Sequence, residues 1–212
     1  MSEPFEFDSP RGIEEESLRR VEGLLHNLNL APGEMEIAKR VAHATGDPEI
    51  ARTLVFGSSA VEAGLRAIRA GEAIVTDVRM VQVGIDGPRV RDLGIQVHCL
   101  IHDLEVGEEA KRLGTTRARI AMRKAARGLR GGIVAIGNAP TALFEILALI
   151  AAREASPALV IGVPVGFVGA QESKDLLLAS PIPHITLPGT RGGSPIAVSI
   201  VNALLRLAKG VV

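Results

Sequence analysis

The sequence predicts a Rossmann-like α/β fold, in which a mostly parallel β-sheet carries helices on both faces. From Gly71 onward, apolar runs of strand length alternate with helical stretches, and the runs are continuous, as in strands buried on both faces. Before Gly71 the pattern is helical only. The chain has 212 residues, of which 47% are apolar, and this suits a single domain, residues 1–212, with a helical N-terminal part.

The N-terminal part is predicted to contain four helices behind a loose arm of residues 1–12. A second helix can open at Pro32 and end at Gly46, the Asp-Pro pair at 47–48 can start a third, and a fourth is expected over about residues 60–70. The first helix is marked by apolar side chains at three- and four-residue steps, namely Leu18, Val21, Leu25 and Leu28.

The rest of the chain is predicted to alternate strands and helices. The strands are the apolar runs at residues 73–75, 96–101, 133–136, 159–163 and, more weakly, 184–187. The helices are the stretches at residues 116–129, 140–153, 171–179 and 194–208. Because crossovers between parallel strands are right-handed, the loops that follow the strands should gather along one edge of the sheet.

The composition excludes several classes of function. Basic and acidic residues number 24 each, and the chain has no Trp or Tyr, so it lacks the positive field and the stacking platforms typical of nucleic-acid binding. Cys99 is the only cysteine, which excludes an intrachain disulfide and a cysteine-based metal cluster. The start of the chain does not resemble a signal peptide, and no apolar stretch is suited to span a membrane. We therefore expect a cytoplasmic protein with no nucleic-acid or membrane partner.

Three predicted strand-to-helix junctions, at residues 137–141, 164–169 and 189–195, are rich in glycine and share one design. Glycines let backbone N–H groups approach a ligand, and helix N-termini favour anions. Asn138 and Ser194 are expected to cap the helices that follow. Any one of these loops could be an ordinary tight turn, but three of them on one edge indicate an anion-rich ligand.

These loops do not match the common nucleotide or hydrolase signatures. No G-x-G-x-x-G follows a strand, no glycine-rich loop ends in the G-K-[ST] of a P-loop, and there is no G-x-S-x-G elbow. A dinucleotide, NTPase or serine-hydrolase function is therefore disfavoured. Glycine-rich loops would also suit an α/β enzyme that acts on phosphate esters, but this sequence lacks the phosphate-binding signatures.

Among the histidines, His43 is the best placed for acid–base chemistry. It lies in the last turn before Gly46 and one turn from Arg40, where a helix C-terminus favours a cationic side chain. A histidine in this position can hold a proton near neutral pH and release it. From spacing alone, a surface histidine at a helix end is the alternative. His98 and His102 lie four residues apart but lack a third partner, so no metal site is predicted.

Arginine is favoured over lysine, at 19 residues to 5, and the guanidinium fork matches carboxylate oxygens in pairs. Arg117 follows Thr116 at a predicted helix start. A threonine cap, backbone N–H donors and a guanidinium would therefore all point in the same direction. An arginine is slightly unfavourable near a helix N-terminus, and a nearby anionic ligand would remove that objection.

Several segments resemble the precorrin-8X methylmutase family. The two longest are GNAPTAL from Gly137 and GVPVGFVGAQESK from Gly162. The shorter ones are VAHATGD at 41–47, DVRMV at 77–81, GTTR at 114–117 and GGS at 192–194. The matches run in the family's order and cover the chain from about residue 13 to residue 207.

The resemblance implies a homodimeric α/β isomerase of cobalamin biosynthesis. Such an enzyme moves a methyl group from carbon 11 to carbon 12 in ring C of precorrin-8X or cobalt-precorrin-8, which gives hydrogenobyrinate or cobyrinate. The shift is intramolecular, so the resemblance implies neither a cofactor nor a methyl donor. The alternative is a corrinoid-binding carrier that holds the product without turnover. The matching acid–base and substrate-contacting residues argue against the carrier.

The resemblance also implies roles for individual residues. His43 matches the family's acid–base histidine, and Ser17 and Arg40 match its substrate-contacting serine and arginine. Pro188 stands where the family usually has an arginine, and Arg191 could substitute for it. With the loops included, the predicted substrate site contains Ser17, Arg40, Thr116, Arg117, Gly137, Asn138, Gly166, Phe167, Ser173, Lys174 and Arg191.

Overall fold

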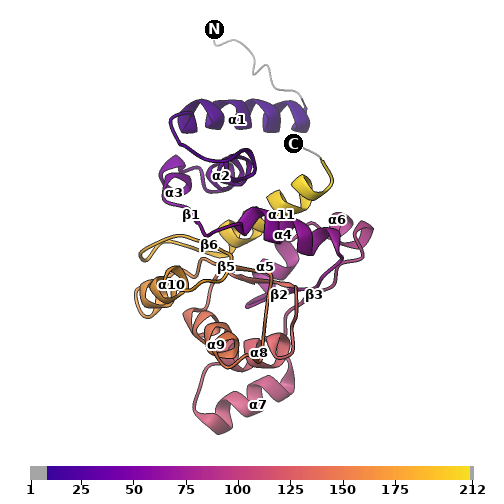
Figure 1. Cartoon of the computed structure of the whole chain (residues 1–212), viewed down its shortest axis with the longest axis vertical. Helices are drawn as coiled ribbons and strands as arrows, with labels where there is room; N and C mark the ends of the chain where they lie inside the picture. Colours follow the sequence, from indigo (N-terminus) through magenta and orange to yellow (C-terminus); the bar gives the residue numbers. More distant parts are fainter. Residues whose placement is uncertain (1–8, 211–212) are drawn as a thin grey trace.

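The computed structural model describes residues 9–210 and confirms the α/β class (Figure 1). Its six-stranded sheet has the order β1-β6-β5-β4-β2-β3. All the pairings in this sheet are parallel except that of β1 with β6, which is antiparallel. The strands are β1 (Val55–Phe56), β2 (Ile74–Thr76), β3 (Val97–His98), β4 (Ile133–Ile136), β5 (Leu159–Gly162) and β6 (His184–Thr186).

The helices pack around this sheet, and none of those described is both long and apolar enough to cross a membrane. The N-terminal ones are α1 (Pro10–Leu25), α2 (Pro32–Thr45), α3 (Pro48–Arg52) and α4 (Ala60–Arg69). Those in the middle of the chain are α5 (Arg79–Gly84), α6 (Gly87–Asp92), α7 (Leu104–Leu113) and α8 (Arg117–Ala126). The last three are α9 (Pro140–Ala151), α10 (Ala170–Leu178) and α11 (Ser194–Ala208).

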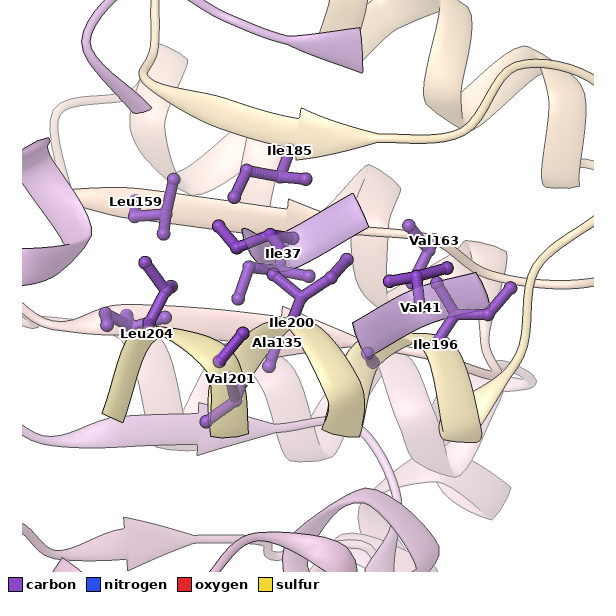
Figure 2. Close-up of a cluster of buried hydrophobic side chains, with 14 of the residues drawn as sticks. Ile37, Val41, Ala135, Leu159, Val163, Ile185, Ile196, Ile200, Val201 and Leu204 are labelled. Atoms are coloured by element: carbon purple, nitrogen blue, oxygen red, sulfur yellow. The ribbon is translucent and has the colours of Figure 1, made fainter. Parts of the chain in front are cut away.

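Different helices cover the two faces of the sheet. Successive strand residues point to opposite faces, so neighbouring residues of one strand pack against different helices. On one face, Ala135 of β4 packs with Ile37 of α2 and Ile200 of α11 (Figure 2). On the other face, its neighbour Val134 packs with Leu143 of α9 and the buried side of α8. Both faces are therefore buried, which explains why the central strands are continuously apolar.

The loops after β4, β5 and β6 meet at the carboxyl edge of the sheet, as predicted. Gly193 donates a backbone hydrogen bond to the Val163 carbonyl at 2.9 Å. A Cβ atom on Gly192 would lie 2.3 Å from that same carbonyl oxygen, and one on Gly137 would lie 2.7 Å from the Cα of Ser194. Glycine is required at residues 192 and 137 because the backbones of neighbouring loops touch there.

The chain begins its first helix earlier than predicted. Residues 1–8 lie outside the described residues, but α1 starts at Pro10, so the loose arm of 1–12 is wrong for its last three residues. Ser9 is the N-cap, and its hydroxyl accepts a hydrogen bond from the Gly12 N–H at 3.0 Å. Pro10 suits the first turn. The predicted stop of α2 at Gly46 is confirmed, with Gly46 in the left-handed region at φ 65°.

The sequence pattern does not predict β1 or the helices α5, α6 and α7. β1 has two residues and α5 and α6 have six each, which is too short for a periodic signal. α7 buries only Val106 and Ala110 along its length. The strand expected at 96–101 is confined to β3, whose two residues are half-buried at the edge of the sheet.

Two expected helix caps are wrong. α9 has Ala139 rather than Asn138 at its N-cap, with no side-chain cap hydrogen bond. α11 has Gly193 at its N-cap, and Ser194 is its first helical residue. Asp47, in contrast, caps α3 as predicted and accepts a hydrogen bond from the Glu49 N–H at 2.9 Å.

Candidate functional site

The structure brings His43 and Ser17 together on the helical side of the molecule. His43 lies in the last turn of α2, and Ser17 faces it from α1. A hydrogen bond of 2.8 Å joins the Ser17 Oγ atom to the His43 Nδ1 atom, across 26 residues of sequence. His43 is exposed and Ser17 is half-buried. The hydroxyl therefore fixes one ring nitrogen of a histidine that a ligand can reach.

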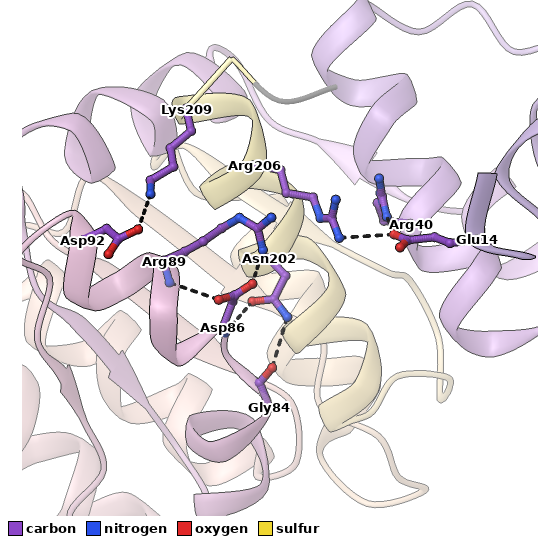
Figure 3. A network of polar contacts seen from close by, with 9 residues as sticks. All are labelled: Glu14, Arg40, Gly84, Asp86, Arg89, Asp92, Asn202, Arg206 and Lys209. Carbon is purple, nitrogen blue, oxygen red and sulfur yellow. Dashed lines mark hydrogen bonds and ion pairs between the residues drawn. The ribbon is translucent and has the colours of Figure 1, made fainter. Parts of the chain in front are cut away.

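Arg40 lies one turn before His43 and belongs to a row of alternating charges. Its Nε atom donates to Glu36 Oε1 at 3.0 Å, and its Nη1 atom donates to Glu14 of α1. Arg206 of α11 contacts the same Glu14 oxygen at 3.1 Å (Figure 3). The hydrogen bond from Arg40 holds the pKa of the Glu14 carboxyl below its ordinary value, and Arg206 acts in the same direction. Three helices thus meet through charged side chains beside His43.

A hollow of about 160 Å³ opens beside His43 between α2, α11 and the turn from α5 to α6. Its wall is ordered by Asn202, whose Oδ1 accepts from the Asp86 N–H at 2.9 Å and whose Nδ2 donates to the Gly84 carbonyl at 3.0 Å (Figure 3). The residues that line it are Arg40, His43, Ala44, Asp86, Ser199, Asn202, Ala203 and Arg206. It combines the imidazole of His43 with two guanidinium groups, the Asp86 carboxylate and neutral polar side chains.

Ser17 lines a second hollow, of about 270 Å³, on the outer surface of α1. The other lining residues are Ile13, Glu16, Arg20 and Val21. Ser17 and His43 therefore each line a hollow of their own.

Sequence reasoning missed several residues of the His43 hollow. Asp86, Ser199, Asn202 and Arg206 belong to none of the motifs found in the sequence, and neither does Glu14, which contacts Arg40 and Arg206 beside the hollow. One signal was nevertheless present, because Ser199, Asn202 and Arg206 follow one another at three- and four-residue steps. Such spacing puts a polar stripe on one face of α11, which is otherwise strongly apolar.

The glycine-rich loop after β4 does not offer its backbone donors to a ligand. The buried carboxylate of Asp77 accepts hydrogen bonds from the N–H groups of Gly137 at 3.1 Å, Asn138 at 2.8 Å and Ala139 at 2.7 Å. Burial raises the pKa of the Asp77 carboxyl, and the three N–H donors oppose that rise. In this structure the amides of Gly137 and Asn138, which we expected to face an anionic ligand, are used within the protein, and the Asn138 side chain is exposed.

Ser173 and Lys174 also point inward. Both side chains are fully buried. Ser173 Oγ donates to the Ala170 carbonyl at 2.9 Å, and Lys174 Nζ donates to the Arg191 carbonyl at 2.6 Å. Burial lowers the pKa of the Lys174 amine to about 8. In this structure the polar groups of both side chains are therefore used within the protein, where they hold the backbone of Ala170 and Arg191.

Arg191 and the loop after β5 are exposed at the carboxyl edge. The Nη2 atom of Arg191 lies 3.4 Å from Asp47, four residues beyond His43, so this loop reaches the end of α2. Gly166 donates its N–H to the Thr190 carbonyl at 3.1 Å and adopts φ 149°. Phe167 follows with 93% of its surface exposed. This edge therefore offers an arginine and an apolar tip.

Thr116 and Arg117 are not brought next to His43. They start α8, on the face of the sheet opposite α2. Thr116 caps α8 by accepting from the Arg119 N–H at 3.2 Å and shares a hydrogen bond of 2.8 Å with Thr141. Arg117 lines a separate hollow with His102 and residues of α7. Over residues 9–210, no group of three or more His, Cys, Asp and Glu side chains is arranged to hold a metal ion.

Comparisons with known proteins show similarity over most of the chain. The cobalt-precorrin-8 methylmutase of Priestia megaterium is 46% identical over 199 residues, which cover 94% of this chain and 88% of the relative. The precorrin-8X methylmutase of Pseudomonas aeruginosa is 42% identical and covers 84% of this chain and 86% of its own length. A crystal structure of precorrin-8X methylmutase from Thermus thermophilus superposes with a TM-score of 0.86 at 42% identity, covering 95% of this chain and 98% of that one.

The sequence profile of one family extends the match over nearly the whole chain. Residues 12–207 match the family described as precorrin-8X methylmutase. That range contains α2 with His43, all six strands of the sheet and α11 up to its last residue but one. The chain belongs to the precorrin-8X methylmutase family and is an isomerase of cobalamin biosynthesis.

Proposed function

We propose that this isomerase moves the methyl group from carbon 11 to carbon 12 in ring C of precorrin-8X or cobalt-precorrin-8, with His43 as its acid–base group. The observation that carries the proposal is the Ser17–His43 hydrogen bond of 2.8 Å beside an arginine-lined hollow. Relatives with both substrate names are more than 40% identical to this chain. A family shared with both kinds of enzyme supports the reaction type but does not choose between the substrates.

The chemistry asked of His43 is to polarise the conjugated ring. Ser17 holds Nδ1, so the other ring nitrogen, Nε2, is the one that can share a proton with the substrate. A proton placed near ring C draws electron density through the conjugated system and lowers the barrier to a methyl shift between adjacent carbons. The same proton returns to His43 afterwards, so the reaction is balanced without another reactant.

The substrate's carboxylate arms explain the charges around the hollow. Arg40 and Arg206 stand on its wall, and Arg191 is exposed on the neighbouring loop. Guanidinium groups bind carboxylates with paired hydrogen bonds, and several such contacts would hold the ring in one orientation. Fixing the ring next to His43 contributes to the rate because the reacting geometry is selected on binding.

We also propose that the enzyme works as a cytoplasmic homodimer. Thr116 and Arg117 match the family pattern but lie on the face of the sheet opposite His43. A second protomer could supply them to the site. Exposed apolar side chains such as Phe167, Val168 and Leu104 offer a surface for self-association. Sedimentation of the purified chain should give twice the monomer mass of 22.3 kDa.

The experiment that tests the function is an absorbance time course with metal-free precorrin-8X and, in parallel, with cobalt-precorrin-8. The chain has no Trp or Tyr, so its own absorbance leaves the chromophore spectrum nearly unobstructed. Conversion of either compound to the rearranged corrin chromophore is expected, and the faster substrate identifies the natural one. A spectral shift without conversion of either compound would indicate a carrier and would contradict the proposal.

A further inference from the structure

Two neighbouring pairs of side chains join α1 to α2. Glu14 lies one helical turn before Ser17 on α1, and Arg40 lies one turn before His43 on α2. Residues three apart on a helix share a face. The Glu14–Arg40 ion pair and the Ser17–His43 hydrogen bond are therefore successive contacts of a single helix–helix seam.

The apolar core holds only the C-terminal half of α1. Val21 is 8% exposed and Leu25 is completely buried in the main core cluster. Ile13, at the other end, is 52% exposed, and Leu18 is only half-buried. Apolar packing therefore does not set the position of the turn that carries Ser17.

Polar contacts hold the N-terminal half of α1. The Glu14 carboxylate is held from two sides, by Arg40 of α2 and by Arg206 of α11 at 3.1 Å (Figure 3). Arg40 is itself fixed by Glu36, whose side chain is only 4% exposed. The partners of Glu14 thus belong to the packed part of the fold, and Glu14 ties the Ser17 turn of α1 to them.

We propose that Glu14 is a positioning residue for the reaction, because it fixes the first half of α1 so that the Ser17 hydroxyl holds Nδ1 of His43. The inference rests on the proposed role of His43. Glu14 acts through Ser17 and not on the substrate, since its carboxylate would repel the carboxylate arms of a precorrin. The other charged groups around His43 are Arg40 of α2, Arg206 of α11 and Asp86 before α6.

The variant Glu14→Gln tests this role, and Glu22→Gln is its matched control. Glu22 lies on the same helix and also pairs with α2, through Lys39 at 3.5 Å, but it is two helical turns beyond Glu14 and away from His43. Both substitutions remove one charge and keep the side-chain length. Glu14 is 39% exposed in its side chain, so Glu14→Gln should fold, which a thermal melt of both variants checks.

Two readouts separate positioning from simple docking of α1. We expect Glu14→Gln to lower kcat about 10- to 100-fold with a smaller change in KM, because a displaced catalytic contact costs this much. We also expect the nitrogen NMR signal of His43 Nδ1 in the free enzyme to move toward that of the Ser17→Ala variant. Only five histidines contribute signals, and His43→Ala assigns the relevant one. Glu22→Gln should leave both readouts unchanged.

The double variant Glu14→Gln/Ser17→Ala decides whether Glu14 acts through Ser17. If it does, the double variant should be no slower than Ser17→Ala alone, since coupled residues are not additive. Losses that multiply would overturn the proposal, as would equal effects of Glu14→Gln and Glu22→Gln or an unchanged Nδ1 signal in Glu14→Gln. The NMR readout needs no substrate, so it can fail or succeed independently of the proposed methyl transfer.

Discussion

The helical seam of α1, α2 and α11 and the glycine-rich carboxyl edge of the sheet differ in how they use their polar groups. The difference is not the one that their sequences indicate. The carboxyl edge carries the longest family motifs, yet its backbone donors and its buried lysine are bound within the protein by Asp77 and by the Arg191 carbonyl. The helical seam carries short and ordinary-looking segments, yet it exposes His43 and places Arg40 and Arg206 on the wall of the hollow beside it. The long motifs of this molecule reflect tight packing of loops, and the polar side chains proposed for the chemistry lie in other segments.

The difference has a physical cause. Loops that cross at the end of a buried sheet must satisfy their buried backbone groups internally, because water does not reach those groups. This requires glycines at close approaches and a few buried polar side chains, which together make a long motif. Side chains on helices can present charge to solvent without such constraints. A site built on helices therefore needs only a few particular residues and leaves a short motif. We therefore expect substitutions in the two regions to have different signatures.

The largest effect is expected from His43→Ala on the helical seam. Loss of a general acid–base group should lower turnover about 10²- to 10⁴-fold, with product binding largely kept and with little change in stability, because His43 is exposed. His26→Ala is the control, since His26 is also an exposed histidine at a helix end. The absorbance assay measures the rate, and a titration with the rearranged corrin measures binding. Normal turnover of His43→Ala would remove the acid–base assignment.

The next effect is expected from Asp77→Asn at the carboxyl edge, and it should fall on stability. An amide cannot accept all three N–H groups that the carboxylate accepts, so buried donors lose their partners and the free energy of unfolding should drop by about 2–4 kcal/mol. Urea unfolding should show a lower midpoint at an unchanged slope. Asp103→Asn is the control, because Asp103 precedes α7 without a side-chain cap hydrogen bond. A stability loss no greater than that of Asp103→Asn would mean that the carboxylate does not hold this loop.

The smallest effect is a pH dependence due to Lys174. Its pKa is lowered from 10.5 to about 8 by burial, so between these pH values the unfolded chain holds a proton that the folded chain has released. Stability therefore falls as the pH drops from 10.5 to about 8, and it rises in the opposite direction by about 1 kcal/mol per pH unit. The difference in unfolding free energy between wild type and Lys174→Met isolates this contribution. A difference that stays constant over that window would place Lys174 in contact with solvent.

The sequence predicted the fold class and most of the elements, because these depend on local patterns. The apolar runs that became β2, β4, β5 and β6 are buried on both faces, and their periodicity needs no knowledge of the partner strand. The helix signals at Pro32, Gly46 and Asp47 are likewise local. β1, α5 and α6 escaped prediction because two to six residues carry too little pattern.

The site could be predicted only in part. The resemblance to a family pointed to His43, Ser17 and Arg40, and the structure brings these three together. It did not point to Glu14, which contacts Arg206 across 192 residues of sequence. Nor could it show that the Gly137 loop is bound internally by Asp77, 60 residues earlier.

By itself, the sequence determined that this is a single α/β chain of the methylmutase family with a histidine at the end of its second helix. Those conclusions follow from periodicity, caps and ordered motifs, which are properties of neighbouring residues. Only the tertiary structure decided which polar groups face outward and which are used within the protein. The physical reason is that a backbone amide, a carboxylate or an ammonium group looks the same in sequence whether its partner is a ligand or another residue. The partner is chosen by packing among α1, α2, α11 and the loops at the end of the sheet.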